Sequence, residues 1–428
     1  MKRILLLIAI LMLLFTVPIA QAEELVIAGL FDDTIIDQYQ ADHPDVQIIG
    51  KAEYFFSTNA LIDAITTHSS DFDVMVLWTG NQNVAQLIRK RYCVPLNDLL
   101  ADHVGGMYPA IREAVMQDGK LYALPLSVTW TGLAYDEAAF AATGLSVPQS
   151  WEDVAALING WDEQPEEIRN QWQIGEYVER YSSWFLLRMN ESYVSYLQLT
   201  GQPLAFDTPL YHQLMELQAG LCATADQNPM LDELSPLLTA GTDIAQLMNW
   251  RLVPLQMEDE VVYKGGLYVA IINPFSEHQE TAMSLLNYMA QRLSDTSRIQ
   301  MFPNANDPVE NPHYTEELAS WEAKRNRLQA ELDACDPANQ RDCQEALNNH
   351  LQRLPLIESR QYLVDAETIE AWHNMMAQMI FPKPTVLDLN EDIFTTLEFR
   401  YLDGELPLEQ YIIEMERMAN MIMQEAGQ

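Results

Sequence analysis

The sequence predicts an α/β protein with two domains. The chain has 428 residues, which is too long for one compact core, because single cores stop growing at roughly 250–300 residues. Short apolar segments that suit buried strands alternate with segments that suit helices, and this alternation is typical of a sheet covered by helices. Hydrophobic residues make up 48% of the chain, which is enough to fill two cores.

The clearest strands lie in the first eighty residues. Strands are predicted over Leu25–Gly29, over Val46–Ile49 and over Phe72–Leu77. The third of these is almost continuously apolar, as expected of a strand that is buried on both faces of a sheet. The intervening segments, up to Tyr39 and over Thr58–Thr67, are predicted to be helical.

The amino terminus has the pattern of a secretory signal. Lys2 and Arg3 precede an apolar run over 4–15, and the small residues Ala20 and Ala22 follow it. This run is too short to cross a bilayer, so residues 1–22 are expected to be a cleaved signal peptide, with an uncleaved anchor as the alternative. No cysteine lies near Ala22 to carry a lipid. The mature chain is therefore expected to be periplasmic or secreted.

The charge of the chain limits its partners. The net charge is −38, and without Lys2 and Arg3 the remaining 22 basic residues face 62 acidic ones, giving −40. Such a field repels nucleic acid and anionic lipid and attracts cations. Screening confines the effect to about 8 Å at physiological salt, so it biases the choice of ligand without fixing it. We expect no nucleic-acid partner, and a solubilising surface is the simplest interpretation.

Motifs of catalysis are missing from the sequence. It contains no Gly-x-Ser-x-Gly, no His-Glu-x-x-His, no phosphate-binding loop and no paired-cysteine metal motif. Residues 388–392 resemble the start of a calcium loop, but Ile393 occupies the position that needs glycine. We therefore expect no enzyme activity, no cofactor and no metal.

Residues 118–151 carry the most informative pattern. A turn at Asp118-Gly119 opens a strand predicted to end at Pro125, and a second strand is predicted over Trp130–Tyr135. A helix follows, and then a Gly-Leu-x-x-Pro segment enters another helix at Trp151. This pattern resembles the first interlobe crossing of the extracellular solute-binding proteins of ABC transporters, in the maltose-binding-protein-like, sugar-binding family.

The resemblance implies a two-lobe, periplasmic-binding-protein-like fold of type II with a hinge. Each lobe would be a mostly parallel sheet flanked by helices. Val261–Ile272, with Gly265 and Gly266, is the expected second crossing, and the helices expected after Ser276 and over Phe394–Met423 also fit the family. The implied division is an N-terminal lobe over 23–132 and 266–311, a C-terminal lobe over 133–265 and 361–428, and an inserted helical hairpin over 312–360.

The hairpin is predicted from its own periodicity. Seam positions recur at alternating spacings of three and four in two segments. They are Leu318, Trp321, Arg325, Leu328, Leu332 and Cys335 in the first segment and Cys343, Leu347, His350 and Leu354 in the second. Two such helices joined by a short loop form an antiparallel pair. The pair could dock a partner or act only as a spacer.

Four cysteines in an exported chain invite disulfides. Cys335 and Cys343 flank the predicted loop of the hairpin and are the expected pair. Cys93 and Cys222 fall in different lobes on the family interpretation. A bridge between them would hinder hinge motion, so both are expected to be buried thiols.

Aromatic residues are the best candidates for the binding site. Sugar rings stack on aromatic faces, and their hydroxyls need polar partners. Trp78 follows the third strand at its carboxyl end, where open parallel sheets bind ligands, and Asn81 lies in the same loop. The family carries a tryptophan in the corresponding loop, so the resemblance implies that Trp78 is a ligand platform. A core position is the alternative.

The resemblance implies further contacts. Thr129 and Trp130 begin the hinge strand, although Trp130 could equally pack the hinge. Glu179 and Tyr181 resemble the start of the second-lobe helix, where the family's tyrosine stacks on sugar. The remaining candidates are Trp250 as a platform, Gly265 as a point of backbone approach or a strand bulge, and Asp33 as a hydroxyl acceptor or helix cap.

The predicted function is therefore that of the solute-binding component of an ABC importer. A monomer would capture a small solute, most simply a mono- or oligosaccharide, and deliver it to the membrane permease. A polyamine or another cation is the alternative within the same fold, motivated by the charge of the chain. A receptor or scaffold that feeds a sensor kinase through the hairpin is the alternative from another class, and an exported glycosidase is more distant.

Overall fold

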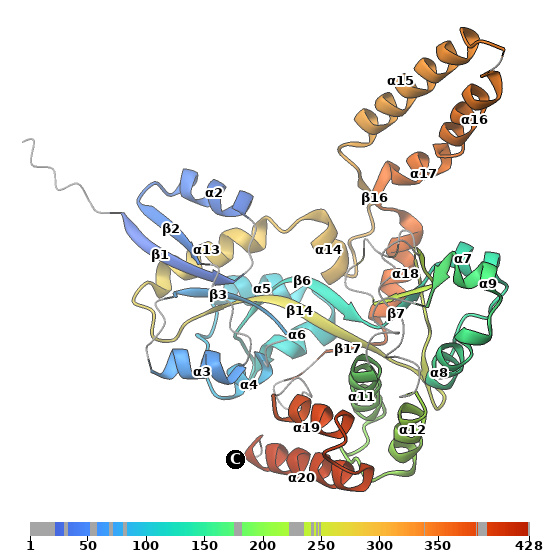
Figure 1. The fold of residues 1–428 in the computed structure, drawn as a ribbon. Helices are drawn as coiled ribbons and strands as arrows, with labels where there is room; N and C mark the ends of the chain where they lie inside the picture. Colours follow the sequence, from blue (N-terminus) through green and yellow to red (C-terminus); the bar gives the residue numbers. More distant parts are fainter. Residues whose placement is uncertain are drawn as a thin grey trace, which may run out of the picture.

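The structure is a computed structural model with two hydrophobic cores (Figure 1). It describes residues 22–29, 33–51, 58–67, 72–79, 84–174, 182–221, 235–240, 244, 247, 250–337, 339–381, 383 and 392–426. We call the part around the first core the first lobe and the part around the second core the second lobe. The predicted two-lobe α/β class is confirmed. Within the described residues, no helix combines the length and the apolar character needed to cross a membrane.

The first lobe is built on a six-stranded mixed sheet. Its strand order is β17-β14-β3-β1-β2, and β6 also pairs with β14. The pairs of β1 with β2 and with β3 are parallel, whereas β14 runs antiparallel to β3 and to β6. The strands are β1 (Glu23–Gly29), β2 (Val46–Lys51), β3 (Val74–Trp78), β6 (Leu124–Thr131), β14 (Tyr263–Ile272) and β17 (Met379–Ile380).

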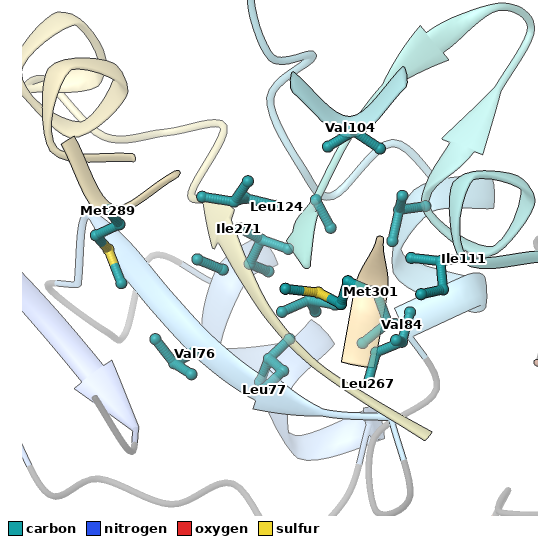
Figure 2. Close-up of a cluster of buried hydrophobic side chains, with 14 of the residues drawn as sticks. Val76, Leu77, Val84, Val104, Ile111, Leu124, Leu267, Ile271, Met289 and Met301 are labelled. Carbon is teal, nitrogen blue, oxygen red and sulfur yellow. The ribbon is translucent and has the colours of Figure 1, made fainter. Parts of the chain in front are cut away.

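Helices bury both faces of this sheet. Figure 2 shows side chains of β3 (Val76, Leu77) and of β14 (Leu267, Ile271) in the core, with Met289 and Met301 contributed by helices. The almost continuous apolar runs of β3 and β14 follow from this burial on two sides. The helices of this lobe are α2 (Asp33–Asp42), α3 (Thr58–Thr66), α4 (Val84–Arg89), α5 (Asp98–Gly105), α6 (Pro109–Val115), α13 (Gln279–Gln291), α14 (Asp295–Met301) and α18 (Ala366–Met376).

The predicted break at Pro125 is wrong. β6 runs through this proline, and the chain leaves the first sheet only after Thr131. Pro125 lies opposite Val269, where the register of the β6–β14 pair shifts. A proline is tolerated at such an irregularity because it has no N–H to give to the ladder.

The second lobe has a small antiparallel sheet and many helices. β7 (Leu133–Tyr135) lies between β10 (Leu238–Ala240) and β11 (Arg251–Leu252), and both pairs are antiparallel. The expectation of a mostly parallel sheet in each lobe is therefore wrong for this three-stranded sheet, although the two-residue strands β8 (Trp172–Gln173) and β9 (Ser235–Pro236) pair in parallel. The helices of the second core are α7 (Glu137–Thr143), α8 (Trp151–Asn159), α11 (Ser182–Thr200), α12 (Pro209–Ala219), α19 (Asp392–Leu402) and α20 (Leu408–Ala426).

Local capping explains the motif that follows the first crossing. The Asp136 side chain accepts a hydrogen bond from the Ala139 amide and starts α7. Gly144 ends this helix with φ of 70°, which glycine adopts at no steric cost. Ser150 then caps α8 through the Asp153 amide. The Gly-Leu-x-x-Pro pattern is therefore the stop of one helix and the start of the next.

The chain passes between the two cores within a few residues at two crossings. Trp130 lies in the first core and Leu133 in the second. On the way back, Val262 lies in the second core and Tyr263 in the first. A further passage separates Phe381, in the first core, from Phe394, in the second. The crossings of β6 to β7 and into β14 are those that the sequence predicted.

Two predicted lobe boundaries are wrong. The C-terminal lobe was expected to extend to residue 265, but β14 begins at Tyr263 and belongs to the first sheet. Residues 361–428 were expected in the C-terminal lobe, but 362–381 pack in the first core, to which Val364, Trp372 and Met379 contribute. The indole N–H of Trp372 donates to the Gln300 carbonyl at 3.2 Å, and β17 pairs with β14 in the first sheet. The chain enters the second lobe for the last time only after this strand.

The inserted hairpin forms an arm that projects from the body (Figure 1). It consists of α15 (Tyr314–Asp333) and α16 (Gln340–Leu351), followed by α17 (Leu354–Glu358). In the structure a disulfide joins Cys335 to Cys343 beside the loop between the helices. Trp321 stacks on His350 with ring centroids 4.9 Å apart, and each of these residues bonds to the carbonyl of the other. The predicted antiparallel pair is confirmed.

The other two cysteines were expected to be buried thiols. Cys93 is a buried free thiol in the first core, and burial raises its pKa. Cys222 lies outside the described residues. A buried thiol whose pKa is raised stays protonated and unreactive at neutral pH.

A polar cluster lies at the centre of the second core. The Asn190 amide nitrogen donates to the Glu398 carboxylate at 2.7 Å and to the Tyr411 hydroxyl at 3.1 Å. The Tyr211 hydroxyl donates to the Asn190 oxygen at 2.9 Å. Burial raises the pKa of Glu398 to about 7. The Glu398 carboxyl of α19 is therefore linked to α11 through Asn190. The charge of this carboxyl changes near neutral pH.

The raised pKa of Glu398 makes the stability of the second lobe depend on pH. The pKa of Glu398 in the folded protein lies above the ordinary value of 4.5. The contribution of Glu398 to the free energy of unfolding is therefore complete below about pH 4.5 and is lost as pH rises through about 7. We expect the wild type to lose about 2–3 kcal/mol more free energy of unfolding between pH 5 and pH 8 than Glu398→Gln does. Urea unfolding of both proteins at the two pH values measures this difference. Equal losses would contradict the assignment.

Candidate functional site

Trp78 is held at the carboxyl end of β3 by a specific hydrogen bond. Its indole N–H donates to the Thr129 hydroxyl on β6 at 3.0 Å. Its rings stack on Tyr268 of β14, with centroids 6.3 Å apart and an angle of 23° between the planes. The side chain remains partly exposed. A platform whose orientation is fixed before a ligand arrives loses little entropy on binding.

Gly266 provides the space for this arrangement. It lies opposite Thr129 in the β6–β14 pair. A Cβ at position 266 would lie 2.6 Å from the Thr129 hydroxyl oxygen and 3.2 Å from the Trp78 indole nitrogen. The glycine therefore allows β3, β6 and β14 to bring these two side chains together.

Gly265 faces a different environment. A Cβ there would lie 2.4 Å from the Phe381 ring and 2.7 Å from the Met379 sulfur. Packing of the chain that leaves β17 thus accounts for this glycine without a solute. Contact between Gly265 and a solute stays a prediction.

The two residues at the start of the predicted hinge strand are both buried. Trp130 is 1% exposed and lies in the first core, which corresponds to the packing alternative. Thr129 is 9% exposed and receives the Trp78 hydrogen bond. Thr129 is therefore a positioning group for Trp78, and direct contact of either residue with a solute stays a prediction.

Trp250 connects the second lobe to the first. It is partly exposed and packs against the first core, into which Ile244 and Leu247 also insert. It lies one residue before β11 of the second sheet. The segment that carries this predicted platform thus lies where the two cores meet.

The side chains of the remaining predicted contacts are not among those that the structure describes. Asn81, Glu179 and Tyr181 lie outside the described residues, and Asp33 is described only as the first residue of α2. The calcium-like segment over 388–390 also lies outside them. Among the described residues, no group of three or more histidine, cysteine, aspartate or glutamate side chains is arranged to hold a metal.

A buried ion cluster at the crossing strands was not predicted from the sequence. The Glu191 carboxylate of α11 contacts Lys264 of β14 at 2.9 Å and Arg188 at 2.6 Å. Burial raises the pKa of Glu191, but the charges of Arg188 and Lys264 outweigh burial and lower it overall. Arg188 and Glu191, three residues apart in an apolar helix, were the available signal. We call Arg188, Glu191 and Lys264 the hinge ion cluster.

A small cavity adjoins the hinge ion cluster. It is lined in part by Gly132 and Leu133 of one crossing, Tyr263 and Lys264 of the other, and Trp151 of α8. Its volume of about 20 Å³ gives room for about one water molecule. The cavity is far too small for a sugar in this arrangement of the lobes.

Comparison with known proteins supports the predicted class. Residues 34–208 match the family described as bacterial extracellular solute-binding protein. A comparison with curated proteins finds no match. This part of the chain, less than half of its length, is therefore similar to the family that the sequence resemblance implied.

Solved structures of sugar-binding proteins share the fold. The GacH receptor of Streptomyces glaucescens, solved unliganded and with acarbose, is 13% identical at a TM-score of 0.58, and the match covers 94% of this chain and 99% of that chain. Maltose-bound MalE3 of T. maritima is 13% identical at 0.58, with 94% and 100% covered. Lmo0181 of Listeria monocytogenes, in complex with cycloalternan, is 14% identical at 0.56, with 94% and 99% covered.

Adding a methyl group at position 266 tests the built geometry of Trp78. Gly266→Ala places a Cβ against the Thr129 hydroxyl, so we expect the Trp78–Thr129 hydrogen bond to break and the protein to lose about 1–3 kcal/mol of stability. The nitrogen-15 NMR signal of the Trp78 indole N–H reports the bond directly. Gly105→Ala is the matched control, because a Cβ there meets nothing within 4 Å. An unchanged indole signal in Gly266→Ala would contradict this geometry.

Proposed function

We propose that the protein is the extracytoplasmic solute-binding component of an ABC importer and that its solute is a mono- or oligosaccharide. The observation that carries the proposal is Trp78, a partly exposed indole fixed by Thr129 at the carboxyl end of a parallel strand. Such a fixed aromatic face suits the C–H face of a sugar ring. The structural relatives that were solved with acarbose, maltose and cycloalternan support the same class of solute.

The proposed mechanism is capture followed by rotation of one lobe against the other. Crossing strands that change core within a few residues are suited to act as hinges, because those few residues can absorb the change of backbone angles. Trp78 would bind from the first lobe and Trp250 from the junction with the second. A solute that contacts both lobes favours the closed state by its difference in affinity for the two states.

The remaining parts of the proposal concern place and partners. The family description supports a location outside the cytoplasm, and residues 1–22 would direct export there. The closed protein would then dock as a monomer on the permease of the transporter. We propose no catalytic role, because the chain would release its solute unchanged.

A panel of sugars and polyamines in a thermal-shift assay tests the proposed function. A ligand at about 100 times its dissociation constant adds about 2.7 kcal/mol to stability. We expect a shift with at least one sugar, and we expect Trp78→Ala and Trp250→Ala each to reduce the affinity at least tenfold, because a stacking face is lost. Phe275→Ala is the control, since this aromatic side chain is 49% exposed on a turn of the first lobe.

The salt dependence of binding separates the two classes of solute. A neutral sugar should bind equally well at low and high ionic strength, whereas a polyamine should weaken steeply as salt rises. Shifts with polyamines alone would overturn the sugar assignment and leave the solute-binding role. No shift with any member of the panel, together with turnover of an oligosaccharide, would overturn that role as well.

A further inference from the structure

The hinge ion cluster connects the two lobes where the chain crosses between them. Glu191 belongs to α11 of the second lobe, and Lys264 belongs to β14 of the first sheet. One carboxylate oxygen lies 2.9 Å from the Lys264 ammonium, and the other lies 2.6 Å from the Arg188 guanidinium. The Glu191 side chain is 5% exposed and that of Lys264 is 12% exposed. Each oxygen of Glu191 therefore has a cationic partner: Lys264 on β14 for one, and Arg188 on α11 itself for the other.

Lys264 lies at the end of the first sheet that faces the hinge. It pairs with Thr131, the last residue of β6, and with Ile380, the last residue of β17. β6 and β17 end at this level, and β14 begins there. A rotation of the second lobe about the crossings therefore moves α11, and with it Glu191, relative to Lys264.

A second polar contact joins α11 to the same level of the sheet. The Gln198 amide donates to the carbonyl of Phe381, one residue after β17, at 3.3 Å. Glu191 and Gln198 are two turns apart on α11, so this helix contacts the first lobe along its length. The ion pair is the charged part of that contact.

The energetics of buried ion pairs indicate what this pair can do. Such pairs add little net stability, because the cost of desolvating the charges offsets most of their attraction, but a geometry that separates the partners without hydrating them is disfavoured, because it leaves a buried charge uncompensated. In the arrangement described, Trp151 and Tyr263 help to shield the cluster, and the adjoining cavity has room for about one water molecule. Opening of this contact would admit water and weaken the attraction several-fold.

We propose that the hinge ion cluster is an interlobe latch that stabilises the lobe arrangement described here. The Lys264–Glu191 contact forms in this arrangement and separates when α11 rotates away from β14. Arg188 keeps the carboxylate charged and in place. The consequence for solute affinity rests on the proposed function, since a shift in the interlobe equilibrium changes apparent affinity by the same factor.

Distance measurements without any solute test the latch. Spin labels on Leu99→Cys of α5 and Ile413→Cys of α20, both well exposed, report the interlobe distance in a Cys222→Ser background. In the pair variant Lys264→Met with Glu191→Gln, neither partner of the interlobe contact keeps its charge. We expect a second interlobe distance to appear, with the ratio of the two populations shifted about tenfold from that of the wild type.

Two further variants keep the test decisive. Lys264→Gln leaves Glu191 paired with Arg188 and should shift the populations in the same direction, so the test does not depend on the folding of the pair variant. Arg417→Gln removes an exposed ion pair within α20, formed with Glu414 at 2.7 Å, and should leave the distances unchanged. Folded Lys264→Gln with the wild-type distance distribution would overturn the latch. Because no solute is used, this result stands apart from the sugar assay.

Discussion

The antiparallel pairing of β6 with β14 is the constraint on which the rest of the structure depends. β14 pairs with β3, β6 and β17 and so connects the strands of the first sheet. The chain leaves for the second lobe at the end of β6 and returns from it at the start of β14. Their side chains fill the first core, and their ends set where the second core begins. The glycine at position 266 lets the same pair position Trp78 against Thr129. One pair of strands thus defines the core, the candidate platform and the hinge.

This constraint explains why the candidate site and the hinge ion cluster lie on the same strand. Gly266 and Lys264 are two residues apart on β14, so their positions face the same side of the sheet. One position accommodates the fixed indole, and the other carries the charge that meets α11. A movement of the second lobe that separates Glu191 from Lys264 would therefore occur within a few residues of the platform.

Features that depend on local pattern could be predicted from the sequence. The buried strands, the capped helices around Gly144 and Ser150, and the seam of the inserted arm all follow from residues close together in the chain. Features set by distant contacts could not. β17 has only two residues, so no periodicity placed 362–381 in the first lobe. Lys264 and Glu191 are 73 residues apart, and only the folded chain shows that they meet. The glycine pair Gly265 and Gly266 is visible in the sequence, but the side chains that pack against it, such as Phe381 and Thr129, are not.

In the proposed mechanism a sugar bound near Trp78 brings the two lobes together. Small-angle X-ray scattering of the whole protein, with and without a saturating sugar identified by thermal shift, measures this movement. We expect a smaller radius of gyration in the presence of the sugar. Binding of the sugar with an unchanged scattering curve would show that the lobes do not close.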